Sequence, residues 1–163
     1  YRRKIFNLKY HSNNMISYLK SLSEKKLIGL VVILLAIISL STGFYKSTDF
    51  NDYAGVAKFF SGYYSADIRS SHNLIYGLFN SPLVYLFRSF WVLKLASVFW
   101  IFLIILSVYY ITNKDRRTLI LLLVSPIIWY MGPWINPIQI SSLLFLWGFY
   151  FFKKFNKIEK SKY

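Results

Sequence analysis

The feature that most constrains this chain is a set of long apolar runs. Residues 27–45, LIGLVVILLAIISLSTGFY, contain no charged side chain, and residues 90–112 contain only Lys94. A helix rises ~1.5 Å per residue, so either run can cross a hydrocarbon layer of ~30 Å. Two shorter runs, 119–134 and 138–152, meet at the breaker-rich GPWINP. We expect an all-α integral membrane protein with about four transmembrane helices at these positions.

The composition supports this class. Hydrophobic residues make up 56% and aromatic residues 21% of the 163 residues, more apolar surface than a single soluble core of this size can bury. The formal net charge is +14, a value that by itself could indicate a nucleic-acid partner. The basic residues instead form blocks beside the apolar runs, so we expect membrane lipid and no nucleic acid as the partner. The absence of cysteine excludes disulfides and thiolate chemistry.

The basic blocks also predict an orientation. They lie in residues 1–26, in the loop NKDRR (113–117) and in residues 153–163. Positive loops stay on the cytoplasmic side, which makes 1–26 a cytoplasmic N-terminal segment, 27–152 the membrane domain and 153–163 a cytoplasmic tail. The loop 46–89 then lies on the outer face. Lys94 is close enough to one end of its run for its amine to snorkel to the interface.

The segment 74–87, LIYGLFNSPLVYLF, is apolar but short for a full crossing. Asn80, Ser81 and Pro82 interrupt it. If it crossed, the NKDRR loop and the tail would move outside, against the charge rule. We therefore expect a short re-entrant or interfacial segment on the outer face, with five crossings as the alternative.

The outer loop carries an expected amphipathic helix over residues 53–64. Its apolar residues recur at helical spacing, and they are Val56, Phe59, Phe60 and Tyr63. Such a juxtamembrane helix would lie flat on the bilayer, and Asp52 would fall on its membrane-facing side. In an equally weighted interpretation, Asp49 is the N-cap of this helix and Asp52 its third residue, so that the two carboxylates only stabilise the helix start.

The same loop carries a resemblance to a known family. The motif residues, which follow the first apolar run, are Asp49, Phe50, Tyr53, Ala57, Phe60, Gly62 and Tyr64. A Tyr-containing apolar segment with a proline (76–83) comes next, and the stretch SPIIWYMGPWINPIQISSLLFLW comes later. In this order the motifs resemble the GT-C family of integral-membrane glycosyltransferases that use polyprenyl-phosphate sugars, over about residues 27–152.

The resemblance implies a catalytic carboxylate soon after the first run. Asp49 matches that place best and Asp52 second, as general base on an acceptor hydroxyl. For the lipid phosphate and substrate, the implied residues are Arg69, Lys58, His72 and Tyr53, of which Arg69 is the strongest because its guanidinium can form two hydrogen bonds to a phosphate. Mg²⁺ or Mn²⁺ bridging the phosphate is compatible with this scheme, which does not require a metal.

Two other classes compete with the enzyme. One is a non-catalytic membrane subunit whose aromatic-rich helices pack against a larger membrane partner. The other is a lipid or ion carrier with a polar path through the membrane. The carrier is disfavoured because uncharged polar side chains in membrane-spanning helices more often form hydrogen bonds between helices than line a transport path. The subunit is the main alternative to a glycosyltransferase.

Overall fold

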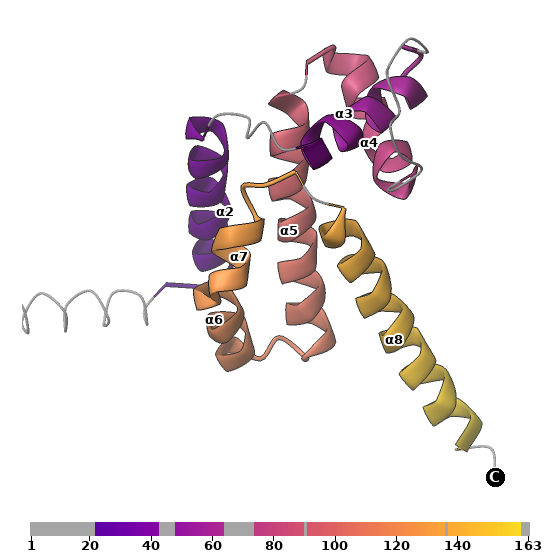
Figure 1. Cartoon of the computed structure of the whole chain (residues 1–163). Helices are drawn as coiled ribbons and strands as arrows, with labels where there is room; N and C mark the ends of the chain where they lie inside the picture. The colour runs from indigo at the N-terminus through magenta and orange to yellow at the C-terminus, as the bar shows by residue number, and fades with distance from the viewer. Residues whose placement is uncertain (1–21, 43–47, 64–73, 90, 136, 161–163) are drawn as a thin grey trace, which may run out of the picture.

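The computed structural model describes residues 22–42, 48–63, 74–89, 91–135 and 137–160 (Figure 1). Within these ranges the chain forms helices and no strand, so the all-helical part of the expected fold class is confirmed. In chain order the helices are α2 (Glu24–Ser41), α3 (Thr48–Phe60), α4 (Leu74–Phe87), α5 (Trp91–Ile111), α6 (Arg116–Val124), α7 (Pro126–Met131) and α8 (Ile138–Lys160).

The expectation of about four membrane-spanning helices is wrong for the part of the chain that the structure describes. There, α5 alone is both long enough and apolar enough to cross a bilayer. Its bounds lie within one residue of the expected span 90–112 at each end. The core helices of soluble proteins include helices of this length and composition as well.

The other expected spans fail for identifiable reasons. Helix α2 begins with Glu24, Lys25 and Lys26, and this charged first turn takes up part of its 18 residues. The region 119–134 is broken at Ser125, where Pro126 forces the preceding residue into an extended conformation, and the two pieces have 9 and 6 residues. Helix α8 continues for 23 residues to Lys160, into the segment expected to be a charged tail.

Helix α5 is the central element of the fold, and it contacts α2, α4, α6 and α8. Its apolar side chains form one core with those of α2, α6 and α7, and the buried members are Ile28, Val31, Leu35, Val98, Ile101, Ile105, Leu119, Leu123 and Ile128. Arg116 at the start of α6 lies 3.6 Å from the carboxylate of Glu24 and donates a hydrogen bond to the carbonyl of Leu22. These contacts join the start of α2 to the start of α6.

Helices α3 and α4 pack together at the end of the fold where α5 begins, crossing the direction of α5 (Figure 1). Their core is separate and smaller, and its buried members are Ala54, Ala57, Tyr76, Val84, Leu93 and Ile140. At the other side of α5, α8 leans away from the remaining helices toward its C-terminal end (Figure 1). The described residues thus form a bundle around α5, with the α3–α4 pair at one end.

Candidate functional site

Helix α3 carries both candidate carboxylates, one turn apart. It begins at Thr48, five residues before the start expected from the sequence, so Asp49 is its second residue and Asp52 its fifth. Asp49 is therefore not the N-cap residue and Asp52 is not the third residue, because the helix already begins at Thr48. A carboxylate in the first turn of a helix still stabilises the helix, because it interacts with the positive end of the helix dipole. Asp52 is half-buried, whereas the side chain of Asp49 lies outside the described part of the structure.

The buried face of α3 differs from the apolar face expected from the sequence. Its buried residues are Ala54, Val56, Ala57 and Ser61, while Phe60 and Tyr63 are 42% and 40% exposed. Small residues allow α3 to approach α4 closely: a Cβ at Gly77 would lie 2.2 Å from Cγ1 of Val56. Asp52 is one helical turn before Val56 and shares its side of α3. At Val56 this side packs against α4.

Tyr53 and Tyr76 join the two helices beside Asp52. Their ring centroids are 5.8 Å apart, and Tyr76 is 1% exposed. The hydroxyl of Tyr76 has no hydrogen-bond partner among the described residues. Burial raises the pKa of Tyr76 above its ordinary value of 10.0, and the nearby Ser97 hydroxyl acts in the opposite direction. The hydroxyl of Ser97 itself donates to the carbonyl of Leu93 at 3.1 Å.

Helix α4 has the bounds expected for the interfacial segment, but its polar residues do not interrupt it. Pro82 lies inside the helix and lacks the N–H that would bond to the carbonyl of Leu78. The hydroxyl of Ser81 donates to that carbonyl instead, at 3.0 Å. Asn80 donates to the carbonyl of Tyr76 and accepts from the indole N–H of Trp100. Ser81 therefore compensates for Pro82 within the helix, and Asn80 connects the helix to α5.

Among the candidate phosphate-binding residues that the structure describes, Lys58 lies away from Asp52. Lys58 is in the last turn of α3, ~9 Å along the axis from Asp52 at ~1.5 Å per residue, and on another side of the helix. Its amine lies 5.6 Å from the ring centroid of Tyr63, in a cation–π contact. Arg69 and His72 lie outside the described residues. Of the predicted site residues, the described structure thus has Asp52 and Tyr53 next to each other on α3, and Tyr53 lies at the contact with α4.

The described ranges contain no ligand set for the divalent ion with which the scheme is compatible. No group of three His, Cys, Asp or Glu side chains there could hold a metal ion. Asp52 is the one candidate carboxylate whose side chain is described, and a single carboxylate is too few protein ligands for a dedicated cation site. We therefore derive no step through Mg²⁺ or Mn²⁺.

A buried lysine near this site has a role that the sequence analysis did not foresee. Lys94 is 4% exposed, and its amine does not snorkel to an interface. It donates to the carbonyl of Ser39 at 2.6 Å and also bonds to the carbonyl and the hydroxyl of Thr42, at the C-terminal end of α2. A cation there satisfies carbonyls that have no helical partner and complements the helix dipole. The available signal in the sequence was the position of this lysine near the start of the apolar run 90–112, at the same end of the fold as the end of the run 27–45.

Comparison with known proteins gives no further identification. No protein-family model, no curated protein and no solved structure matches this chain. The GT-C resemblance therefore rests on the motif residues alone and is used below as a proposal.

Proposed function

We propose that this chain is a membrane-bound glycosyltransferase, or part of one, that transfers a sugar from a polyprenyl-phosphate donor to an acceptor hydroxyl. The observation that carries the proposal is the close contact of α3 with α4, because the half-buried carboxylate of Asp52 lies on α3 one turn before the contacting residue Val56. The first-turn position of Asp49, one turn before, keeps it as the second candidate base.

The position of this contact supports the proposal in physical terms. The start of α5 is the point where a helix of membrane-spanning length and composition meets the α3–α4 pair. A lipid-borne donor would present its sugar at such a boundary, and an acceptor from either phase could reach it. The tight packing of Val56 on Gly77 and of Tyr53 on Tyr76 restricts the movement of α3, as a catalytic carboxylate requires.

The proposed chemistry uses one carboxylate as general base. The carboxylate takes the proton of the acceptor hydroxyl while that oxygen bonds to the anomeric carbon of the sugar. The bond between the anomeric carbon and the phosphate oxygen breaks at the same time, so the configuration inverts and polyprenyl phosphate leaves with the electron pair. A cation must stabilise the leaving phosphate, and Arg69 remains our candidate for this role.

The test is sugar transfer by the purified full chain in detergent, with a panel of synthetic polyprenyl-phosphate sugars as donors. We expect Asp52→Asn or Asp49→Asn to lower the rate by ~10²–10⁴-fold, the usual contribution of a general base. Asn preserves side-chain size and helix-start hydrogen bonding, so circular dichroism should remain unchanged. Unchanged turnover in both single variants and in the double variant would remove the carboxylates from the mechanism.

The non-catalytic membrane subunit stays a second candidate because of the surface of α8. This helix packs against α5 and exposes large aromatic side chains outside the pocket that it forms with α5, at Phe145, Phe149, Phe152 and Phe155. Exposed apolar side chains of this size are typical of a contact with a partner or with lipid. Native mass spectrometry distinguishes the candidates: a bound polyprenyl phosphate supports the enzyme, and a large second chain without lipid supports the subunit.

A further inference from the structure

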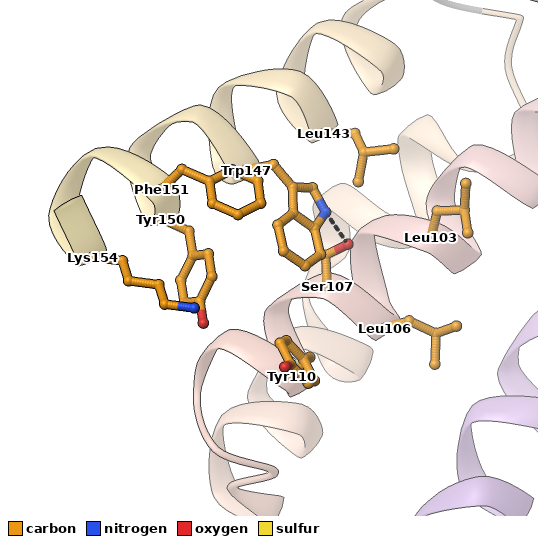
Figure 2. A pocket seen from close by; sticks show the side chains of 9 residues that line it. All are labelled: Leu103, Leu106, Ser107, Tyr110, Leu143, Trp147, Tyr150, Phe151 and Lys154. Atoms are coloured by element: carbon orange, nitrogen blue, oxygen red, sulfur yellow. Dashed lines mark hydrogen bonds between the residues drawn. The ribbon is translucent and has the colours of Figure 1, made fainter.

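A pocket of about 580 Å³ lies between α5 and α8, away from the α3–α4 pair (Figure 2). Its volume is in the range of small-molecule and cofactor sites, which are mostly apolar with a few placed polar groups. It is bounded by Ser107 and Trp147, whose hydroxyl and indole N–H are joined by a hydrogen bond of 2.9 Å. This bond fixes the indole ring as one wall of the pocket.

The chemical character of the walls changes along the pocket. Leu103, Leu106 and Leu143 lie toward one end, whereas Tyr150 and Lys154 lie at the other (Figure 2). Tyr110 stacks on Trp147 with ring centroids 6.1 Å apart. Leucines provide a surface for hydrocarbon, and tyrosine and tryptophan rings are typical of the level of lipid headgroups. The pocket thus matches a molecule with a hydrocarbon part and a polar part.

The polar end of the pocket is cationic. Lys154 is the charged residue among those lining the pocket, and they include no carboxylate. Lys153 precedes it on α8, and Lys114 follows the end of α5 closely. The nearest acid in sequence to that turn, Asp115, already accepts hydrogen bonds from Arg117 and Thr118 as the N-cap of α6. An anion at this end would therefore meet positive charge.

We propose that this pocket binds one anionic phospholipid, with an acyl chain along the leucines and the phosphate within reach of Lys154. An anionic phospholipid fits both ends of the pocket. A free phosphate would not cover the leucines, and a neutral lipid would not neutralise the charge of the lysine. The tyrosine hydroxyls can donate to the ester and phosphate oxygens between these two parts. The site lies on a different part of α5 from the α3–α4 contact and does not rest on glycosyl transfer.

The experiment uses the full chain in mixed micelles that contain brominated phosphatidylglycerol or brominated phosphatidylcholine. Bromine quenches tryptophan at short range, and the signal of Trp147 is the difference between the wild type and Trp147→Phe. We expect half-maximal quenching of Trp147 at ~5-fold less phosphatidylglycerol than phosphatidylcholine, the effect of one basic residue near an anionic lipid. Lys154→Gln should abolish this preference.

Lys153→Gln is the matched control, since it removes the same charge one position away from the pocket lining. A preference that survives in Lys153→Gln supports the site. Equal loss of the preference in Lys153→Gln and Lys154→Gln would mean that anionic lipid is attracted only by the general positive charge of the helix end. Equal quenching by the two lipids would mean that the pocket does not select anionic lipid. If inorganic phosphate abolishes the preference without displacing the quencher, the pocket is an anion site and not a phospholipid site. Absence of a Trp147 signal would overturn the proposal outright.

Discussion

The two ends of α5 are built differently, although the helix is apolar throughout. Near its start, α5 meets α2 and α4 through buried polar groups, with the amine of Lys94 on the carbonyls of α2 and the indole of Trp100 on Asn80. Further along, α5 meets α8 across an open pocket, where the polar contact is the hydrogen bond between Ser107 and Trp147. The same helix therefore has a closely packed contact at one end and an unfilled one at the other.

This difference follows from side-chain size and from the available acceptors. At the α3–α4 end, Gly77 and the alanines of α3 let backbones approach, and the ends of helices supply carbonyls for buried donors. Between α8 and α5, the large rings of Trp147 and Phe151 line a space that the side chains do not fill. Substitutions of the same type should consequently have different effects at the two ends, and three matched pairs test this.

The glycine pair should give the largest effect, with opposite signs. At Gly77, an added Cβ would meet the side chain of Val56 at 2.2 Å and its backbone carbon at 3.0 Å, so Gly77→Ala should destabilise the fold by ~3 kcal/mol through overpacking. At Gly148 on α8, nothing lies within 4 Å, so Gly148→Ala should stabilise by up to ~1 kcal/mol through helix propensity. Thermal unfolding in detergent, followed by circular dichroism, measures both, and equal effects would refute the difference in packing.

The lysine pair should give an intermediate effect. Lys94→Met removes the donor from the carbonyls of Ser39 and Thr42 and should cost ~2 kcal/mol, because these acceptors lose a buried partner. Lys154→Met removes an exposed amine and should change stability by less than ~0.5 kcal/mol. The same unfolding assay compares them. A cost at Lys94 no larger than that at Lys154 would mean that the end of α2 does not depend on the amine.

The tyrosine pair should give the smallest effect, visible mainly at alkaline pH. Because burial raises the pKa of Tyr76 in the folded state above 10.0, its contribution is complete below about pH 10 and declines as the pH rises further. Tyr76→Phe should change stability by less than ~1 kcal/mol at neutral pH, since the hydroxyl has no partner, and should reduce the alkaline loss. Tyr150→Phe retains Tyr76 and should keep that loss, so identical profiles would contradict the assignment.

The sequence predicted the positions of the helices better than it predicted the contacts between them. The bounds of α4 and those of α5 to within one residue followed from apolar runs and their flanking polar residues. The break between α6 and α7 had a local signal too, in Ser125–Pro126, but a continuous apolar run concealed it. Helix α8 continues past its expected end at residue 152 because lysine is a good helix former, so the backbone can stay helical from residue 153 onward.

The candidate site was less predictable because it depends on tertiary packing. Apolar spacing on α3 suggested a membrane-facing side, whereas Val56 packs on Gly77 of a helix that the chain reaches only after residue 73. No pattern within α5 indicates that the amine of Lys94 binds the end of α2, which is more than 50 residues earlier. The sequence placed Asp52 near the start of a helix, but it did not show that this helix packs on α4 through Tyr53 and Val56.

The break at Ser125 has a consequence for how this part of the chain folds. With 9 and 6 residues, α6 and α7 are each shorter than a helix that is stable alone in water. Their nucleation must therefore be supported from outside, by the burial of Leu119, Leu123 and Ile128 on α2 and α5. The indole N–H of Trp129 then bonds to the carbonyl of Leu123 across the break. The helical state of α6 and α7 thus depends energetically on the surface that α2 and α5 provide.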